Sequence, residues 1–258
     1  MPAVFVGHGT PMNAIEDNAW SRSFAALGRA LPRPRAALVV SAHFYVEGTC
    51  VTGQAHPPTI HDFGGFPPEL SAVQYPAPGD PALAARVIAL LGAKRATVTH
   101  EWGLDHGTWS VLRHAWPDAS VPIVQLSIDE RLRPSEHTAI GTTIGALRDE
   151  GIVVIGSGNL VHNLRDAFLR SRARERITPD WATRFDAATA RAIDERDRSA
   201  LEGALQIGDG PMAHPSPDHY IPLLYVMGAA RPTDRVRYPI TGFDLGSLSM
   251  RAVVLEAP

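Results

Sequence analysis

The sequence predicts a single α/β domain, a sandwich in which helices flank a mostly parallel or mixed central sheet. The first observation behind this prediction is the alternation of short apolar runs with longer segments of helical periodicity. The second is that the sequence contains neither an internal repeat nor a linker that would separate two domains. The third is the hydrophobic share of 45%, which supplies a substantial core for a chain of 258 residues. We therefore expect residues 1–258 to fold as one domain.

Strands are predicted where several apolar, often β-branched residues follow one another. In chain order, these segments are residues 3–6, 36–42, 48–53, 96–99, 121–127, 152–156 and 247–255. Helices are predicted where apolar residues recur with a period near 3.6. These segments are residues 14–29, 80–91, 134–150, 178–201 and 216–229, and the residues after His162 have the pattern of a further helix start.

Particular residues support two of the helix starts. Asn13 is a suitable N-cap for the first helix, and Ser216 is one for the last, with Pro217 at its first helical position. The helix over residues 178–201 is rich in Arg, Asp and Glu, so we expect it at the surface. A Pro- and Gly-rich loop spans residues 55–78, and loops of this length inside a compact domain are usually functional.

Composition and charge exclude several classes of protein. The net charge of −3 and the pI near 6.4 give no electrostatic basis for binding nucleic acid or an anionic membrane. The longest apolar runs are too short to span a bilayer, and the N-terminal residues do not resemble a signal peptide. The lone Cys50 excludes an internal disulfide and a multi-cysteine zinc site. We therefore expect a soluble cytoplasmic protein.

Three apolar runs are each followed by a histidine. His8 follows the run AVFVG, His43 lies in VVSAHF, and His162 lies in GSGNLVHN, where the small residues 156–158 resemble a turn that approaches a ligand closely. Open α/β sheets bind ligands outside the carboxyl ends of their strands, so these side chains can converge. Because neutral imidazole is the commonest protein ligand for transition metals, the sequence predicts a metal site there.

Two further segments contain candidate site histidines. The segment HPSPDHY contains His214 and His219, of which His219 is favoured because Ser216 and Pro217 fix it in the first turn of the last helix. His106 lies in WGLDHGTW, interpreted as a loop in which Trp102 and Trp109 form aromatic walls suited to a planar ligand.

The remaining histidines give weaker signals. His61, beside Asp62 in the loop HPPTIHDFGGFP, can contact a substrate, although loop histidines such as His56 and His61 are often only solvated. Three more are expected to be surface residues: His100, His114 and His137.

Several common catalytic motifs do not occur. There is no HExxH, no P-loop and no GxGxxG dinucleotide loop. Ser157 is flanked directly by glycines and is not in a GxSxG elbow, which argues against a serine hydrolase. Lys94 is the only lysine and lies near none of the motifs, which argues against a Schiff-base mechanism.

Nine segments together resemble the class III, protocatechuate-4,5-dioxygenase-like extradiol ring-cleavage dioxygenases. Within that superfamily they are most similar to the 4,5-DOPA dioxygenase branch. In chain order, the segments are GHGTPMNAIEDN, VVSAHF, PPTIHDFGGFPPEL, YPAPGDPALA, WGLDHGTWSVL, VPIVQLSID, GSGNLVHNLR, HPSPDHYIPLLYVMGA and GSLSMRAV. The resemblance therefore covers nearly the whole chain and implies one extradiol dioxygenase-like catalytic domain.

The resemblance implies a role for each candidate residue. His8 and His43 would ligate the metal, and His219 would be the third ligand in place of a glutamate used elsewhere in the superfamily. His162 would be the general base, close enough to coordinate the metal when substrate is absent. His106 would lie in the substrate pocket and assist proton transfer. The residues expected to hold the substrate ring are His61, Phe63, Phe66, Trp102 and Trp109.

The implied reaction is the opening of a catechol such as DOPA by O2, beside its two hydroxyl groups, to a muconic semialdehyde-type product (seco-DOPA). The implied cofactor is Fe(II), and Zn(II) can occupy the same ligands. An alternative is a zinc-dependent hydrolase that uses a metal-bound water, and a second is a metal-binding protein without activity. The sequence does not predict the oligomeric state. It also does not decide which arginine would bind a substrate carboxylate among Arg22, Arg33, Arg165 and Arg251.

Overall fold

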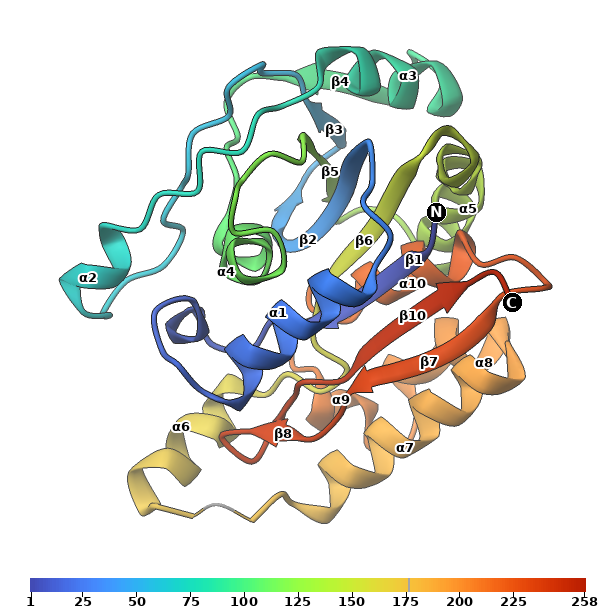
Figure 1. The fold of residues 1–258 in the computed structure, drawn as a ribbon. Helices are drawn as coiled ribbons and strands as arrows, with labels where there is room; N and C mark the ends of the chain where they lie inside the picture. The colour runs from blue at the N-terminus through green and yellow to red at the C-terminus, as the bar shows by residue number, and fades with distance from the viewer. Residues whose placement is uncertain (176) are drawn as a thin grey trace.

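A mixed eight-stranded sheet forms the centre of the molecule in a computed structural model that describes residues 1–175 and 177–258 (Figure 1). The strand order is β4-β3-β5-β2-β6-β1-β10-β7. The strands are β1 (Ala3–Gly7), β2 (Ala36–Val46), β3 (Thr49–Thr52), β4 (Ala96–Thr99), β5 (Ile123–Asp129), β6 (Ile152–Gly158), β7 (Arg235–Ile240) and β10 (Ala252–Glu256). A separate two-stranded sheet pairs β8 (Phe243–Asp244) with β9 (Leu248–Ser249).

The four inner strands, β5, β2, β6 and β1, run parallel to one another. Strand β10 pairs antiparallel with β1 and β7, and β3 pairs antiparallel with β5. Strands β1, β5 and β6 are buried along their whole length, as expected for parallel strands covered on both faces. Their carboxyl ends point toward one edge of the sheet, where parallel α/β sheets bind ligands.

Helices cover both faces of the sheet, which confirms the predicted fold class. The α-helices are α1 (Ala19–Ala30), α2 (Pro68–Ser71), α3 (Pro81–Leu91), α4 (His106–Ala115), α5 (Pro134–Ile144), α6 (Leu164–Ala173), α7 (Asp180–Glu195), α8 (Arg198–Gly203), α9 (Gly210–Ala213) and α10 (Ile221–Gly228). Short 3-10 helices are η1 (Pro11–Ala14), η2 (Gly145–Glu150) and η3 (Ala204–Gln206). Helices α1 and α4 pack on one face, and α3, α5, α7 and α10 pack on the other (Figure 1).

The first helix begins later than predicted. It starts at Ala19 with Asn18 as its N-cap, because the Asn18 side chain accepts hydrogen bonds from the backbone of Trp20 and Ser21. Asn13 instead lies buried in η1, and its side-chain amide donates to the carbonyl of His8 at 3.2 Å. The residue expected to cap a helix therefore holds the loop that carries His8.

Three other predicted elements are divided. The long polar helix breaks at Arg196, which adopts a left-handed conformation (φ 56°), and Asp197 then caps α8. The helix predicted over residues 134–150 ends at Ile144 and continues as η2. The last predicted strand is split into β9 and β10, so the chain can pair first with β8 and then with β1.

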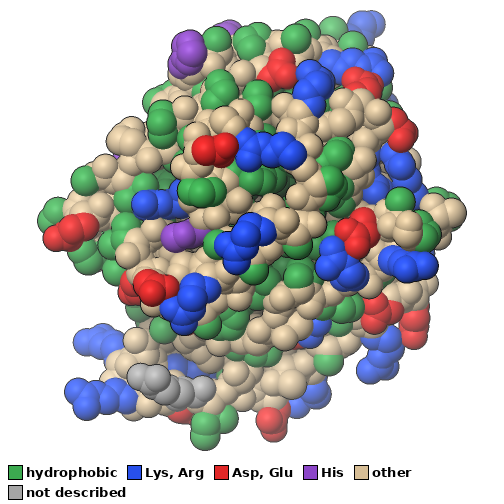
Figure 2. Space-filling view, viewed as in Figure 1, with side chains coloured by type: hydrophobic (Ala, Val, Ile, Leu, Met, Phe, Trp, Pro, Cys, Tyr) green, Lys and Arg blue, Asp and Glu red, His purple; other side chains and the backbone are tan. Residues whose placement is uncertain are grey.

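Two of the longer elements were not predicted. Residues 102–109, interpreted as a loop, include the start of α4, whose N-cap is Asp105. Strand β7 has alternating exposed and half-buried residues at the edge of the sheet, so it lacks the apolar run on which the prediction relied. Among the described residues, no helix is long and apolar enough to cross a membrane. On the face shown in Figure 2, side chains of both charge signs are scattered without a large patch of one sign.

A buried ion pair fastens the end of the sheet opposite the carboxyl ends of β1 and β6. Arg148 and Asp234 are 1% and 0% exposed and share two hydrogen bonds of 2.7 and 2.9 Å. Arg148 also donates to the carbonyls of Met1, Ala229 and Leu255. These hydrogen bonds satisfy the N–H groups of the guanidinium, which offsets the free energy cost of burying the charged pair. They also connect both ends of the chain to the end of α10.

The surface location expected for His137 is wrong. Its buried position predicts that the stability of the protein depends on pH. His137 lies on α5 with no exposed surface, and its Nδ1 is 3.0 Å from the Tyr225 hydroxyl of α10. Burial lowers the pKa of His137 from the ordinary 6.5 to about 4, although Asp129 and Glu136 act in the opposite direction. Below pH 6.5 the unfolded chain takes up a proton that the folded chain refuses until about pH 4, so stability falls as the pH falls through this window.

For the His137→Gln variant, we expect a shallower loss of stability between pH 6.5 and pH 4 than in the wild type. Over this pH range, the wild type should lose about 3 kcal/mol more free energy of unfolding than the variant. This is the free energy that corresponds to the difference between a pKa of 6.5 in the unfolded chain and about 4 in the folded chain. Urea unfolding of metal-free protein at a series of pH values measures it. Parallel stability curves for the two proteins would show that His137 does not titrate in this way.

Candidate metal centre

His8 is held at the carboxyl end of β1 by its neighbours. Its backbone N–H donates to the carbonyl of Gly158 at 3.0 Å, and its carbonyl accepts from Asn13. Gly7 allows the close packing this requires, because a Cβ there would lie 2.6 Å from the carbonyl oxygen of Ser249. The His8 side chain is 1% exposed, and its Nδ1 is 3.0 Å from the hydroxyl of Ser157 on β6.

His43 lies inside β2 and not at its end, because β2 continues to Val46. The register of β2 against β5 shifts between Val40 and Tyr45, and His43 occupies this irregular stretch. Its Nε2 lies 3.2 Å from Nε2 of His8, and its Nδ1 lies 3.3 Å from a carboxylate oxygen of Asp62. The irregularity therefore marks the strand position that delivers the second ring to the site.

His106 is the first residue of α4 and lies against the same carboxylate. Its Nδ1 is 2.9 Å from Oδ2 of Asp62, and its backbone N–H donates to the other oxygen at 2.9 Å. Burial would raise the pKa of Asp62, but the hydrogen bonds and charge of His106, together with the charge of His43, outweigh burial and lower the pKa to about 2. An ionised carboxylate only accepts, so His106 donates its Nδ1–H to Asp62, and Nδ1 of His43 lies 3.3 Å from the same carboxylate oxygen.

His219 and His162 form a stacked pair on the other side of His8. His219 lies in the turn that precedes α10, not in its first helical turn as predicted, and its Nδ1 donates to the carboxylate of Asp218. Burial would raise the pKa of Asp218, but the hydrogen bond from His219 holds it well below its usual range. The ring of His162 lies parallel to that of His219, with centroids 3.4 Å apart and planes at 4°.

Nδ1 of each of the rings of His8, His43 and His219 faces an outer oxygen atom, an arrangement that suits binding of a metal through Nε2. In each case Nδ1 is engaged by an outer partner, which is Ser157, Asp62 and Asp218 respectively. Metal-binding histidines generally donate their second N–H to such a partner, which fixes the tautomer and the ring orientation. Burial also lowers the pKa of His8 and His43 well below the ordinary value, with smaller effects from neighbouring histidines, so the rings are neutral near pH 7.

The distances among three of the rings fit one transition metal. The centroids of His8, His43 and His219 are separated by 5.1, 5.1 and 5.0 Å. Three imidazoles that bind one metal through Nε2 at about 2.1 Å, roughly 100° apart, have centroids about 5 Å from one another. The 3.2 Å between Nε2 of His8 and of His43 likewise matches two ligands of one ion.

A second set of three rings is also close together. Ring nitrogens of His8, His43 and His106 lie within 4.8 Å of one another, so these residues too could hold an ion. The centroid distances in this set are unequal, at 3.8 Å from His106 to His43 and 5.7 Å from His106 to His8. The centroids of the set with His219 are more nearly equidistant, but the group whose ligating nitrogens lie within 4.8 Å of one another contains His106 and not His219.

The stacking of His162 on His219 bears on the predicted fourth ligand. A metal lies close to the plane of each imidazole that binds it. Two parallel planes about 3.4 Å apart cannot both contain the same ion. In this arrangement His219 and His162 therefore cannot ligate one metal together, and the half-buried His162 lies beside the centre.

The predicted aromatic walls are only partly realised. Phe63 packs edge-on against His106, with centroids 5.4 Å apart, and against Phe66 and His61. Trp109 has no exposed surface and donates to the carbonyl of Ile60, so it supports the loop from behind and offers no face to a ligand. Trp102 stacks on Phe44 and donates to Asp105.

Sequence reasoning missed the outer partners of the histidines. From the sequence, Asp62 is only the neighbour of His61 in the long loop, and Asp218 has no assigned role. Asp105, fully buried, caps α4 and accepts from Ser41 at 2.7 Å, which places the helix that begins with His106. The acidic residue next to a histidine, as in Asp105-His106 and Asp218-His219, is the sequence signal that could have indicated them.

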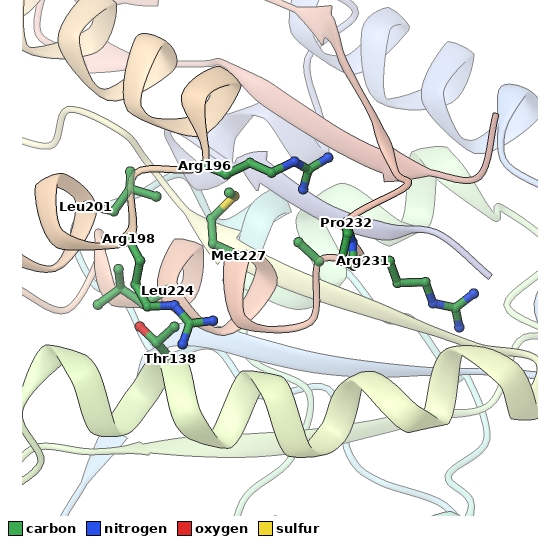
Figure 3. A pocket seen from close by; sticks show the side chains of 9 residues that line it. Thr138, Arg196, Arg198, Leu201, Leu224, Met227, Arg231 and Pro232 are labelled. Carbon is green, nitrogen blue, oxygen red and sulfur yellow. The ribbon is translucent and has the colours of Figure 1, made fainter.

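Other sequence candidates lie elsewhere. His214 is buried against Phe185 and Tyr220, and its Nε2 is 2.9 Å from the carbonyl of Leu160. Three of the four candidate arginines have acidic partners, since Arg22, Arg33 and Arg251 pair with Asp17, Asp118 and Asp186. Arg165 is exposed on α6. The cavity in Figure 3, about 210 Å³, lies between α5, α8 and α10, and none of the five clustered histidines lines it.

The fold and this cluster are those of an α/β metalloenzyme with its site at the carboxyl ends of parallel strands. A family model described as the catalytic LigB subunit of aromatic ring-opening dioxygenase matches residues 2–240. The chain therefore belongs to the LigB family of aromatic ring-opening dioxygenases, which confirms the resemblance found in the sequence. It is an extradiol ring-opening dioxygenase.

Individual relatives cover almost the whole chain. A 4,5-DOPA dioxygenase extradiol of Escherichia coli (strain K12) is 46% identical over 257 residues, which are 98% of this chain and 94% of that protein. A 4,5-DOPA dioxygenase extradiol of Beta vulgaris is 34% identical over 252 residues, 95% and 92% of the two chains. A crystal structure of an uncharacterized Escherichia coli K12 protein matches with a TM-score of 0.84 at 40% identity, covering 99% of this chain and 100% of that one.

Gly107 should be essential to the geometry of the centre. A Cβ at this position of α4 would lie 2.6 Å from the Ser41 hydroxyl and 2.9 Å from Cδ2 of His43. We expect Gly107→Ala to lower the free energy of unfolding by about 1–3 kcal/mol, despite the higher helix propensity of alanine, and to weaken metal binding. Urea unfolding and metal titration measure the two effects.

The matched control is Gly203→Ala, at the end of α8, where an added Cβ meets no atom within 4 Å. This variant should be as stable as the wild type or slightly more stable. If Gly107→Ala behaves in the same way, α4 does not need to approach β2 as closely as described.

Proposed function

We propose that this enzyme opens the ring of a catechol such as DOPA with O2, in a reaction that depends on Fe(II). The nearly equilateral triangle of His8, His43 and His219 is the observation that carries the proposal. Three protein ligands on one side of a six-coordinate ion leave positions for both catechol oxygens and for O2. The names of the Escherichia coli and Beta vulgaris relatives support DOPA as the substrate.

The three proposed ligands are neutral, which suits an anionic substrate. No carboxylate neutralises the ion directly, so an ion held here would keep most of its +2 charge for the oxygens of a catecholate. The chemistry that Fe(II) supplies when bound is Lewis acidity toward the catechol hydroxyls and electron transfer between catecholate and O2. Zn(II) accepts the same ligands but does not change its oxidation state.

His162 is proposed as the general base. Its ring lies against His219, beside the centre and out of a ligating orientation, so it can accept a proton from a catechol hydroxyl. His106 lies on the other side of His43, oriented by Asp62, and would return a proton during ring opening. Phe63, edge-on to His106, would support the face of the substrate ring.

The product would be a muconic semialdehyde-type compound, which for DOPA is seco-DOPA. Cleavage takes place beside the two hydroxyls, and both atoms of O2 enter the product. We also propose that residues 1–258 act as one catalytic domain, since the site draws on β1, β2, α4 and the turn before α10.

An assay of oxygen consumption tests the reaction. Protein reconstituted anaerobically with Fe(II) should consume one O2 per catechol and form a yellow product when L-DOPA or another catechol is added. The Zn(II) form should do neither. Activity on ester or amide substrates that is indifferent to O2, with no consumption of O2 on any catechol, would instead support the zinc-dependent hydrolase.

A pair of variants separates the ligand from the base. His219→Ala should lose bound metal, because it removes one corner of the triangle. His162→Ala should retain about one metal per chain but lower kcat for ring opening by about 10²–10⁴, the usual contribution of a positioned general base. Metal analysis and steady-state kinetics on the two proteins provide the measurement. If His162→Ala keeps its metal and its full ring-opening rate, the assigned base is wrong.

A further inference from the structure

Ser157 joins two parts of the centre through one hydroxyl. It lies next to the last residue of β6 and is 1% exposed. Its Oγ is 2.5 Å from the carbonyl oxygen of Gly107 on α4 and 3.0 Å from Nδ1 of His8. Residues 156–158, expected to form a turn near a ligand, are instead the end of a buried strand.

The two contacts determine where the protons lie. A carbonyl oxygen can only accept, so at 2.5 Å the single hydroxyl proton of Ser157 must point to Gly107. The same oxygen can then only accept from His8, which places a proton on Nδ1 of that ring. Nε2 of His8 is left with a free lone pair, directed at His43.

The glycines on either side of Ser157 allow the end of β6 to pack closely against α10 and the turn before it. A Cβ at Gly156 would lie 2.5 Å from the carbonyl oxygen of Pro222, and one at Gly158 would lie 2.1 Å from that of His219. These two positions therefore face α10 and the turn before it, while Ser157 faces the opposite side of the sheet. The end of β6 thus packs against the backbone of His219 through Gly158 and contacts the ring of His8 through Ser157.

We propose that Ser157 is a positioning residue that fixes His8 as the Nδ1–H tautomer and aims its Nε2 at the metal. The inference rests on the proposed role of His8 as a ligand. Nδ1 of His219 donates to a carboxylate and Nδ1 of His43 lies 3.3 Å from another, whereas the partner of His8 is an uncharged hydroxyl whose own proton is donated to α4. Ser157 therefore orients the ring without adding charge to the centre.

The first experiment uses metal-free wild-type protein. Long-range ¹H–¹⁵N NMR spectra of the histidine rings, assigned with a His8→Ala variant, report which nitrogen carries the proton. We expect His8 to be neutral with the proton on Nδ1. A proton on Nε2 would overturn the proposal, and this outcome needs no serine variant to fold.

The second experiment compares two buried serines. Ser157→Ala should weaken Zn²⁺ binding by about 10–100-fold, the usual effect of removing an outer partner of a ligand, and should shift the His8 tautomer toward Nε2–H. The matched control is Ser110→Ala on α4, since the Ser110 hydroxyl is buried without a hydrogen-bond partner among the described residues. It should bind Zn²⁺ within about twofold of the wild type.

Competition with a chromophoric chelator measures these affinities without any catechol. Equal Zn²⁺ affinity and an unchanged tautomer in Ser157→Ala would overturn the proposal even if the enzyme cleaves catechols. Conversely, the expected tautomer and loss of affinity in a protein that cleaves no catechol would support the role of Ser157 and count against the proposed function alone.

Discussion

The structure depends on the close approach of two imidazole nitrogens, Nε2 of His8 and Nε2 of His43, at 3.2 Å. The contact with Ser157 places the proton of His8 on Nδ1, so the lone pair of its Nε2 faces Nε2 of His43. Burial lowers the pKa of both rings well below the ordinary value, which leaves them neutral and suited to bind a cation together. The fold maintains this contact because β1 and β2 both pair with β6, in parallel, so that their carboxyl ends lie at the same edge of the sheet.

The outer hydrogen bonds come from parts of the chain that are distant in sequence. Ser157 belongs to β6, Asp62 to the long loop between β3 and α3, and Asp218 to the turn before α10. Asp62 contacts His43 and His106 together, so a single carboxylate relates a proposed ligand to the neighbouring acid–base candidate. The long loop is thus part of the centre, which agrees with the functional role that its length indicated.

The sequence predicted the sheet and the converging histidines because buried strands and strand-end imidazoles are local patterns. It did not predict α4, whose first turn, His-Gly-Thr, has weak helix formers and is stabilised by the Asp105 cap and by packing on β2. It placed the first cap at Asn13 because the competing use of that side chain, the carbonyl of His8, is a tertiary contact. The stacking of His162 on His219 likewise depends on the relative position of two separate segments, about which spacing carries no information.

The two carboxylates of the centre lie behind the imidazoles and not among the proposed ligands. Asp62 and Asp218 are both ionised near pH 7, since hydrogen bonds from histidines hold the pKa of each below its usual range. Their two negative charges would balance a divalent cation bound at the distance of one imidazole, which would offset the cost of burying that cation. The neutral imidazoles proposed as ligands would still leave such an ion able to attract an anionic oxygen. Under the proposed function, charge balance and ligation would thus come from different residues, so that one buried site could both retain a cation and bind a catecholate. A carboxylate that ligated the ion directly would weaken the binding of the catecholate.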